Sequence, residues 1–598
     1  MENEGHVAQP TVQHHDLRAP AVAGASPSRA RLRPAAAVAG GLLLYVSFPP
    51  IGLWFLGPAG VALLTLAARG ATARRAAWLG YLGGAAFLLP ALAWVRPIGY
   101  DAWLILVAVE CLYFGAVSAG TALVTRLRWP ALWVAALWVA QEWARGRFPV
   151  GGFPWVRLAF AQGESPFTPY AALGGAPLVT FAVALSGALL AAAALRLARS
   201  RAAARRPGPA APGDAEPAAA PAVPSLPVPA AVAAGPLRAV PAGALAVPSA
   251  AVPAGVPTGP LRAVPRAAAL LLAGAVAVPL LGYAVPRPAA EGGRVIRVGV
   301  VQGDVPGEGM GFLGDRPAVV LGNHARVTHE MAADVRAGRL PRPDIVIWPE
   351  NSTDIDPYRS AYARGVIDAA VRDIGVPVLV GAVVVTPDRE HRHTRAIVWD
   401  PAAGPGAYYD KRQLVPFGEY VPYRELLETF IARVSLVGLQ SLPGDRPGAL
   451  PMGPVTVGAV SCYEVAFDDI VRSTVRAGGT PLAVQTNNAT YALTGLPPQQ
   501  LAMSQLRAVE HDRAVVIAAT TGISAFVDHT GKIRWRSAEK VTAKAVLDVQ
   551  VRTGQTLATR LGPLPEWILL LAGVGALGAA LARRRAPRPK DTTGGEDA

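Results

Sequence analysis

The chain has 598 residues, of which 52% are apolar and 16% charged, and its net charge is +15. Soluble domains contain about a quarter charged residues, so this composition indicates long membrane-spanning segments. The positive charge does not indicate nucleic-acid binding, because the arginines cluster beside apolar runs and no zinc-finger, helix-turn-helix or RNA-binding motif accompanies them. The two cysteines, of which Cys111 lies in an apolar segment, exclude a disulfide framework.

Apolar segments dominate the amino-terminal third of the chain and recur twice later. A spanning helix needs roughly 17–25 mostly apolar residues. Residues 1–33 lack such a run and are predicted to be a disordered cytoplasmic N-terminus. Residues 34–198 are predicted to form six transmembrane helices, residues 267–285 a seventh and residues 565–582 an eighth. The predicted spans within the first group are 34–48, 51–68, 76–95, 102–125, 129–145 and 172–198, with a tight turn at Pro49-Pro50 between the first two.

The placement of arginines predicts the orientation of these spans. With the N-terminus inside, the loops at 69–75, 126–128 and 196–206 and the tail at 583–598 are all cytoplasmic and basic, as the positive-inside rule requires. The opposite loops hold fewer basic residues. Eight spans therefore predict a multi-pass cell-membrane protein with both termini cytoplasmic and residues 290–560 on the extracytoplasmic face.

Residues 199–266 are predicted to be a cytoplasmic linker. Its 207–265 stretch is almost entirely Ala, Pro, Val, Gly and Leu, and the heptapeptide GPLRAVP occurs at 235–241 and again at 259–265. Frequent prolines exclude a helix. Two copies are too few for a stacked repeat array.

Residues 290–560 have the pattern of an extramembrane α/β domain. Short β-like runs, such as 295–301, 344–348, 378–385, 455–460 and 515–518, alternate with helical patterns such as 360–373 and 498–512. This alternation predicts an α/β or layered α-β-β-α domain, and about 270 residues suffice for one large core.

Three stretches of this domain place reactive side chains at the ends of β-like runs. DIVIWPEN contains Glu350, YDKRQLVPFGEYVP contains Lys411 and Glu419, and VSCYE contains Cys462. A lone cysteine is most often a small buried hydrophobe. Strand ends, however, are where α/β sheets collect catalytic groups. A carboxylate can deprotonate a thiol, and a lysine can stabilise an oxyanion, so the three side chains form a coherent nucleophilic site.

The order Glu, Lys, Cys with these flanking residues resembles the nitrilase, or carbon–nitrogen hydrolase, superfamily. The stretches LVPFGEYVP and GGFPW (151–155), together with the multi-span amino half, are similar to its membrane branch, the apolipoprotein N-acyltransferases. The resemblance covers roughly residues 34–198 and 267–582. It implies a four-layer catalytic sandwich outside the membrane and a ping-pong acyl transfer. Membrane phospholipid would acylate the cysteine, and the α-amine of a diacylglyceryl-cysteine on an apolipoprotein would then accept the acyl chain.

Carried over residue by residue, the resemblance implies a role for each candidate. Glu350 is expected to be the general base, Lys411 the oxyanion stabiliser and Cys462 the nucleophile. Glu419 and Glu464 are expected to be supporting acids. Tyr463 is expected to shape the acyl entrance. The carboxylates around Cys462 are expected to keep its thiol neutral at rest.

Several features of the sequence leave alternatives open. Glu464, Asp468 and Asp469 are also the acids that favour a helix N-terminus. The stretch TNNATYAL departs from the family pattern, because Asn488 replaces an acid and Thr490 and Tyr491 replace an aromatic pair. This loop is expected near the mouth of the active site, where its change affects lipid preference.

The remaining polar residues of interest predict no metal and no cofactor. His324 and His329 are separated by five residues, which is not the spacing of a helical metal pair, and no HExxH motif is present. His511 is expected at the surface or in the core. Glu142 and Arg145 on the fifth predicted span are expected to pair with each other.

Two rival functions stay open at this point. One is a hydrolase of the same superfamily that cleaves an amide or nitrile of a small soluble molecule. The other is a membrane scaffold or anchor for a partner polyprenol-phosphate glycosyltransferase, with an inactive outer domain. The intact Glu-Lys-Cys set favours an active enzyme.

Overall fold

The computed structural model describes residues 27–203, 265–286, 293–307, 318–429 and 437–585, together with 431, 434 and 435. By its internal contacts the chain forms two compact units. One comprises Met1–Ala192 with Leu271–Ala598 and contains both the apolar helices and the α/β domain. The other is Ala193–Leu270, and most of the predicted linker within it lies outside the described residues.

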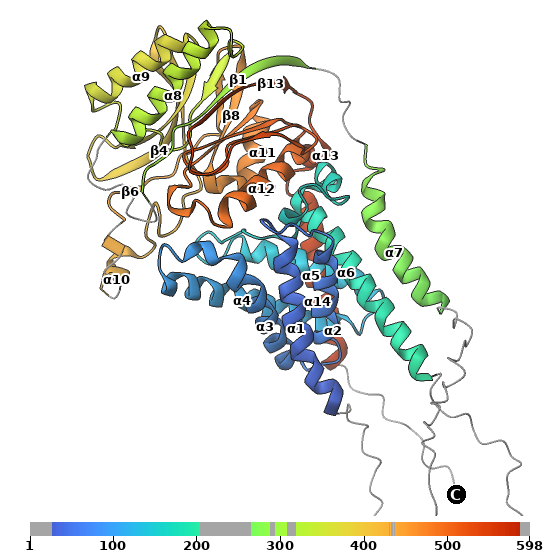
Figure 1. Cartoon of the computed structure of the whole chain (residues 1–598). Coiled ribbons are helices and arrows are strands. Elements are labelled where there is room, and N and C mark those ends of the chain that lie inside the picture. Colours follow the sequence, from blue (N-terminus) through green and yellow to red (C-terminus); the bar gives the residue numbers. More distant parts are fainter. Residues whose placement is uncertain are drawn as a thin grey trace, which may run out of the picture. The chain divides into compact units, whose positions relative to one another are not determined.

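The apolar segments form helices, shown with their labels in Figure 1. They are α1 (Pro27–Ser47), α2 (Leu56–Ala68), α3 (Ala73–Ala91), α4 (Tyr100–Val124), α5 (Pro130–Arg145), α6 (Ala171–Ala203), α7 (Arg266–Gly282) and α14 (Leu564–Arg585). Short 3₁₀ turns accompany them at Ala93–Val95, Leu158–Ala161 and Thr168–Tyr170. Small residues let these helices approach closely. A Cβ added at Gly80 of α3 would lie only 2.2 Å from the carbonyl oxygen of Phe114 on α4.

Several predicted boundaries of these helices differ from the structure. Helix α1 begins at Pro27 and not at residue 34, so the last part of the predicted disordered N-terminus is helical. Helix α2 begins at Leu56, because the turn at Pro49-Pro50 extends through residue 55. Helix α6 contains non-helical backbone at Gly174 and Gly175, where glycine tolerates dihedral angles that other residues avoid. Helix α6 reaches Ala203, inside the predicted linker, and residues 204–264 lie outside the described residues.

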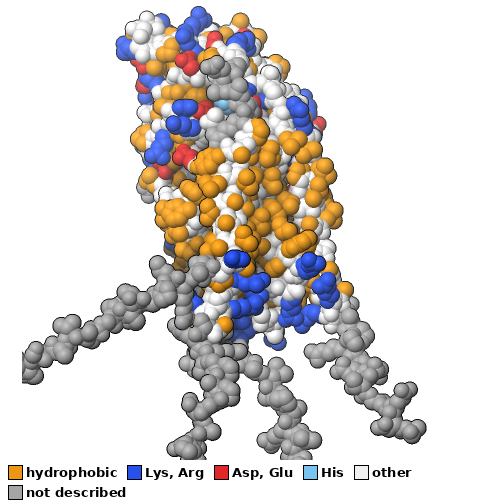
Figure 2. All heavy atoms as spheres, turned by 90° about the vertical axis from the view of Figure 1, so that its right-hand side faces the viewer, with side chains coloured by type: hydrophobic (Ala, Val, Ile, Leu, Met, Phe, Trp, Pro, Cys, Tyr) orange, Lys and Arg blue, Asp and Glu red, His pale blue; other side chains and the backbone are white. Residues whose placement is uncertain are grey.

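Three helices in the described part of the chain are long and apolar enough to cross a membrane: Tyr100–Val124, Thr168–Ala203 and Leu564–Arg584. Shorter apolar helices lie at Leu32–Ser47, Leu56–Ala68 and Arg266–Gly282. The face in Figure 2 carries a broad area of hydrophobic side chains, and Lys and Arg side chains gather at one end of that area. The count of eight spans stays a prediction.

The predicted α-β-β-α sandwich is confirmed. One sheet has the strand order β13-β1-β2-β3-β4-β5, with β6 pairing with β4, and the other has the order β12-β11-β10-β9-β8-β7. The strands of the first sheet are β1 (Arg294–Gln302), β2 (Ile345–Ile347), β3 (Val378–Val385), β4 (His391–Asp400), β5 (Gly404–Asp410), β6 (Gln440–Ser441) and β13 (Ala543–Val551). Those of the second are β7 (Ala449–Met452), β8 (Val455–Ser461), β9 (Leu482–Thr486), β10 (Val515–Ala519), β11 (Ala525–Val527) and β12 (Ile533–Arg536).

The core of the sandwich lies between the sheets, where Val298 and Ile345 of one belong to the same apolar cluster as Val457 and Val516 of the other. Helices cover the two outer faces, as Figure 1 shows. They are α8 (Val319–Arg336) and α9 (Ala361–Ile374) on the first sheet, and α11 (Asp468–Arg476) and α12 (Leu496–His511) on the second. The short elements are α10 (Arg424–Glu428), α13 (Leu557–Leu561), η6 (Cys462–Ala466) and η7 (Ala489–Tyr491).

Local sequence explains why these helices form where they do. Helix α9 buries Ala363, Ile367, Ala370, Val371 and Ile374, which recur at helical spacing along one face. Its first turn is capped by the Ser360 side chain, which accepts a hydrogen bond from the Ala363 N–H, and its end is Gly375 in the left-handed conformation.

Candidate active site

Three strands end beside the same site and deliver the three predicted reactive side chains. Glu350 follows β2 by three residues, Lys411 directly follows β5, and Cys462 directly follows β8. Glu350 and Lys411 come from one sheet and Cys462 from the other. The two carboxylate–lysine contacts described below join residues that are 61 and 8 positions apart in the sequence. The structure therefore brings together residues that are far apart in the sequence.

Lys411 lies between two carboxylates. Its side chain is only 1% exposed, and Nζ is 3.0 Å from Glu350 Oε1 and 3.0 Å from Glu419 Oε1. Burial by itself would lower the pKa of Lys411, but the negative charges of Glu350 and Glu419 raise it well above its usual value. The lysine therefore stays an ammonium ion at neutral pH and presents a fixed positive charge to the site.

Glu350 is buried and held by three donors. Oε1 accepts hydrogen bonds from Lys411 Nζ and, at 2.5 Å, from Ser461 Oγ. Oε2 accepts a hydrogen bond of 3.1 Å from the backbone N–H of Asn487. These contacts fix the orientation of the carboxylate between the ends of β8 and β9.

Cys462 occupies a sharp turn at the junction of β8 and η6. Its φ of +46° lies in the left-handed region, which residues other than glycine seldom adopt. Its half-buried Sγ lies 3.2 Å from Thr486 Oγ1 and 3.6 Å from Gln500 Nε2. Burial, and then the negative charge of Glu350, raise the pKa of the Cys462 thiol to about 11, although Lys411 acts in the opposite direction. The resting thiol is therefore protonated at neutral pH.

Glu419 and Glu464 occupy different surroundings. Besides Lys411, Glu419 accepts hydrogen bonds from Thr394 Oγ1 and from the Val415 N–H. Glu464 is fully buried, and most of its hydrogen bonds come from backbone N–H groups. Its Oε1 accepts hydrogen bonds from Tyr409 OH and from the N–H groups of Arg412 and Gln413, and its Oε2 accepts one from the Ser461 N–H. Glu464 thus ties the loop after Lys411 to the turn that carries Cys462.

Tyr463 packs against the GGFPW stretch of the segment between α5 and α6. Its ring stacks on Phe153 and Trp155, with centroids 6.2 and 6.0 Å apart, and its hydroxyl donates to the carbonyl oxygen of Gly152 at 3.2 Å. Gly152 has φ +80°, and a Cβ there would lie 2.1 Å from the carbonyl carbon of Gly146, so only glycine fits. The GGFPW stretch, whose sequence was related only to the membrane branch of the family, therefore contacts the residue next to Cys462.

The acids that trail Cys462 do not surround its thiol. Asp468 instead receives hydrogen bonds from Arg157 and Arg507 at 2.9 and 2.7 Å, and Asp469 is exposed. Burial would raise the pKa of Asp468, but Arg157 and Arg507 hold it below its usual value. The neutral thiol that was expected owes less to carboxylates than predicted, because burial raises its pKa most and the negative charge of Glu350, which does not trail Cys462, raises it further.

The predicted pair of Glu142 with Arg145 is also wrong. Arg145 forms a buried ion pair of 3.0 Å with Glu110 of α4. Glu142 instead lies 3.4 Å from Arg157 and accepts hydrogen bonds from Thr180 Oγ1 and the Leu158 N–H. Each side chain takes its partner from a different neighbouring segment, which the spacing within one helix does not reveal.

Four polar residues of the site were not predicted from the sequence. Ser461 and Thr486 are the last residues of the buried strands β8 and β9, a position that could have singled them out. Asn487 follows β9, inside the TNN stretch that was predicted to lie near the site. Gln500 lies inside α12, where nothing in the sequence distinguishes it from other polar residues of an amphipathic helix.

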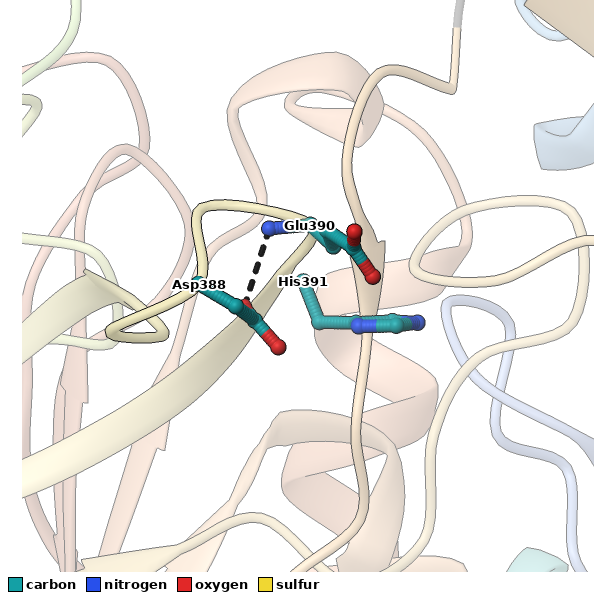
Figure 3. A group of neighbouring side chains, drawn as sticks. All are labelled: Asp388, Glu390 and His391. Carbon is teal, nitrogen blue, oxygen red and sulfur yellow. Dashed lines mark hydrogen bonds between the residues drawn. The ribbon is translucent and has the colours of Figure 1, made fainter.

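The histidines belong to other surroundings. His324 is fully buried beside Trp348, and its Nδ1 lies 2.7 Å from the Val320 carbonyl oxygen, while His329 contacts Asp373. His511 is in the core and contacts Thr559. Figure 3 shows one surface group, Asp388, Glu390 and His391, whose ligand-type atoms lie within 4.8 Å of one another. Asp388 Oδ1 accepts hydrogen bonds from Glu390 N–H and Thr386 Oγ1, as expected of a turn between β3 and β4.

A surface pocket of about 320 Å³ lies beside the loop that follows Lys411. Its lining includes Arg412, Gln413, Tyr420, Gln440 and Ser441. Cys462 does not line it.

Family models and similar proteins point to the same family for this chain. Residues 40–189 match the model of the apolipoprotein N-acyltransferase N-terminal domain, and residues 328–559 match that of the carbon-nitrogen hydrolase family. The chain is similar to apolipoprotein N-acyltransferases of Mycolicibacterium smegmatis, with 38% identity over 92% of this chain and 86% of that protein, and of Azotobacter vinelandii, with 29% identity over 92% and 95%. Among solved structures, a mutant amidase of the nitrilase superfamily from Nesterenkonia AN1 is 20% identical, covers 44% of this chain and 94% of its own, and has a TM-score of 0.32.

Proposed function

Because this chain belongs to the apolipoprotein N-acyltransferase family, we propose that it transfers a fatty acyl chain from membrane phospholipid to the α-amino group of the diacylglyceryl-cysteine of apolipoproteins. The observation that supports this most directly is the buried Lys411 held between Glu350 and Glu419 beside the turn that carries Cys462. The proposed donor is a phospholipid and the proposed acceptor is a lipoprotein N-terminus. No cofactor or metal is required by these steps.

In the first step Glu350 takes the proton of the Cys462 thiol, and Sγ attacks the carbonyl carbon of the phospholipid ester. The ammonium group of Lys411 stabilises the negative oxygen that forms. The ester C–O bond then breaks, a thioester remains on Cys462, and the lysophospholipid oxygen leaves with the proton that Glu350 held.

In the second step the acceptor amine attacks the thioester carbonyl carbon. Glu350 accepts a proton from the amine, the C–S bond breaks, and the proton returns to the Cys462 sulfur. The products are the N-acylated lipoprotein and the free thiol. The fixed positions of Glu350 and Lys411 suit both steps, because neither residue has to move between them.

The other predicted residues take supporting roles in this proposal. Glu419 keeps Lys411 charged and oriented through their 3.0 Å contact. Glu464 positions the turn of Cys462 relative to the loop of Lys411. Tyr463, stacked on Phe153 and Trp155, lines an aromatic path along which an acyl chain reaches Sγ.

We also propose the cellular arrangement predicted from the arginine distribution. The protein is a multi-pass cell-membrane protein with eight spans, both termini in the cytoplasm and the 290–560 domain outside, where exported lipoproteins are found. The apolar helices and the basic side chains that gather at one end of the apolar area in Figure 2 support this arrangement.

The decisive experiment withholds the acceptor. Purified protein is incubated with phospholipid labelled in its acyl chain, and a protein-bound label that neutral hydroxylamine removes is expected, because hydroxylamine cleaves thioesters. Cys462→Ala should give no labelled band. Lys411→Met should form it about 100-fold more slowly or worse, the scale of losing an oxyanion donor. Lys532→Met, which changes an exposed lysine, is the matched control and should label normally.

The same experiment separates the two rival functions. A hydrolase of small soluble amides would not capture label from a phospholipid, and a scaffold for a glycosyltransferase would capture none. Folded wild-type protein that acquires no hydroxylamine-sensitive label would therefore refute the acyltransferase proposal.

A further inference from the structure

Two side chains outside the Glu-Lys-Cys set contact the sulfur of Cys462. Thr486 Oγ1, at the end of β9, lies 3.2 Å from Sγ, and Gln500 Nε2, on α12, lies 3.6 Å from it. Among the residues that the structure describes, these are the hydrogen-bond partners of Sγ. Glu350 is bound instead by Lys411, Ser461 and Asn487.

A third side chain orients these two donors. Asn488 Nδ2 donates to Gln500 Oε1 at 3.2 Å, and Thr486 Oγ1 lies 3.0 Å from the same oxygen. With its oxygen facing these donors, the Gln500 amide turns its NH₂ group toward the sulfur. Thr486, Asn488 and Gln500 are all at most 3% exposed, so water does not compete for these contacts.

The helix that carries Gln500 is fixed to the turn that carries Cys462. Two turns after Gln500, the Arg507 guanidinium donates to the carbonyl oxygens of Val465 and Ala466 in η6, at 2.8 and 3.0 Å. Gln500 is therefore held in place before the sulfur acquires charge. Such preorganisation is what makes hydrogen bonds effective in catalysis.

We propose that Thr486 and Gln500 are catalytic residues that donate hydrogen bonds to the Cys462 thiolate, and that Asn488 is the residue that positions the Gln500 amide. This inference rests on the proposed function. At rest the Thr486 hydroxyl donates to Gln500 Oε1. When Glu350 takes the thiol proton, the hydroxyl rotates and donates to Sγ, and no proton leaves Thr486.

The charges that face Sγ make such donors necessary. From the end of β2 Glu350 opposes the thiolate, from the end of β5 Lys411 favours it, and the phenol of Tyr491 on η7 lies near enough to interact with it. Within α12 the group nearest Sγ is the uncharged Gln500. Burial disfavours the thiolate more strongly than any of these groups, and hydrogen bonds to an ionised sulfur offset that cost.

The test measures thiolate formation without any lipid. The rate at which iodoacetamide alkylates Cys462 is followed at several pH values by mass spectrometry of its peptide, which distinguishes it from Cys111. Loss of one hydrogen bond to the Cys462 thiolate makes this charged form less stable and raises the pKa of the thiol. Alkylation at pH 8 should therefore be about three- to tenfold slower in Thr486→Val, after allowance for the greater nucleophilicity of a more basic thiolate.

The matched variants make the result specific. Thr486→Ser keeps the hydroxyl and should restore the wild-type rate. Ser504→Ala removes a buried hydroxyl from α12, one turn after Gln500. Cys462 in this variant should also be alkylated at the wild-type rate. Asn488→Leu adds no charge and cannot donate to Gln500 Oε1, so it should slow alkylation in the same direction as Thr486→Val, with parallel pH profiles displaced to higher pH.

Thr486→Val and Asn488→Leu proteins that are folded and alkylated at the wild-type rate would overturn the inference. That failure is distinct from failure of the proposed function. If wild-type protein captures no acyl label from phospholipid but the variants still differ in alkylation, the donors are real and the acyltransferase proposal is wrong.

Discussion

At the scale of single residues, Glu464 shows how one carboxylate can act through the backbone. Its two oxygens accept hydrogen bonds from three backbone N–H groups and from the hydroxyl of Tyr409. The first and largest influence on its pKa is burial, which raises it, and the hydrogen bonds lower it again without cancelling the rise. A carboxylate that accepts four hydrogen bonds in this way holds two loops together and is poorly placed to exchange protons.

We therefore expect Glu464→Gln to destabilise the protein. The amide NH₂ would face a backbone N–H on one side or the other and leave that donor unpaired, at a cost of about 1–3 kcal/mol. Thermal unfolding of the purified protein should occur at a lower temperature than in the wild type. Asp469→Asn, an exposed acid of the same segment, is the control and should unfold like the wild type. Unchanged unfolding with lost acyl-enzyme formation would instead make Glu464 a participant in the chemistry.

At the scale of elements, a buried ionic network connects α12, α11, α5 and the segment between α5 and α6. Arg507 contacts Asp468 and, in a very short contact, Glu510, and Arg157 contacts both Asp468 and Glu142. Arg507 has no exposed side-chain surface. Breaking a buried pair is costly because the remaining charge stays unpaired in a medium of low polarity.

Arg507→Met should accordingly lower stability by about 3–5 kcal/mol at neutral pH. The sign of the pH dependence follows from Asp468. Its pKa is lowered in the folded protein, so its ion pairs contribute fully above the usual aspartate pKa of about 4 and are lost as the pH falls further. The difference in the free energy of unfolding between wild type and variant should become smaller below about pH 4, because a protonated carboxyl group no longer forms an ion pair with Arg507.

Chemical unfolding of wild type and Arg507→Met at pH 7 and at lower pH measures the difference in their free energies of unfolding. Arg513→Met on the segment after α12 is a useful control, because Arg513 donates only to backbone carbonyl groups and not to the network. A constant difference at all pH values would show that Arg507 acts through its carbonyl contacts with Val465 and Ala466 alone.

The sequence allowed the elements to be predicted better than their contacts. Glu350, Lys411 and Cys462 could be singled out because each follows or adjoins a β-like run and because their order and flanking residues resemble the nitrilase superfamily; none of the three was distinctive alone. The layers of the sandwich followed from the alternation of strands and helices. The partner of Arg145 was not predictable, since Glu110 and Glu142 are equally plausible until α4 and α5 are packed. The contact of Gln500 with Cys462 depends on how α12 crosses the end of β9, which no spacing encodes.

At the scale of the whole molecule, the apolar helices and the α/β domain belong to one compact unit. Gln499, beside Gln500 on α12, joins them. Its Oε1 accepts hydrogen bonds from the indole N–H groups of Trp94 and Trp155, and its Nε2 donates to the carbonyl oxygen of Ala91 at the end of α3. The helical part thus contacts the same helix whose Gln500 contacts the sulfur of Cys462.

The proposed topology gives the last prediction, which uses single cysteines on a Cys462→Ala background; Cys111 is buried. Glu390 lies in an exposed turn of the α/β domain, Arg74 in the first turn of α3 and Arg584 near the end of α14, and all three are exposed. A maleimide that cannot cross membranes should label Glu390→Cys in intact cells. It should label Arg74→Cys and Arg584→Cys only after the membrane is permeabilised, because basic segments are retained in the cytoplasm.

Each position tests a different part of the topology. Protection of Glu390→Cys in intact cells would place the candidate site on the wrong side of the membrane for exported lipoproteins, and the acceptor class would have to change. Labelling of Arg584→Cys together with Glu390→Cys would mean that α14 does not cross. Helix α14 is long and apolar enough to span, and its basic end matches the end predicted to stay inside, so we expect opposite labelling of these two positions.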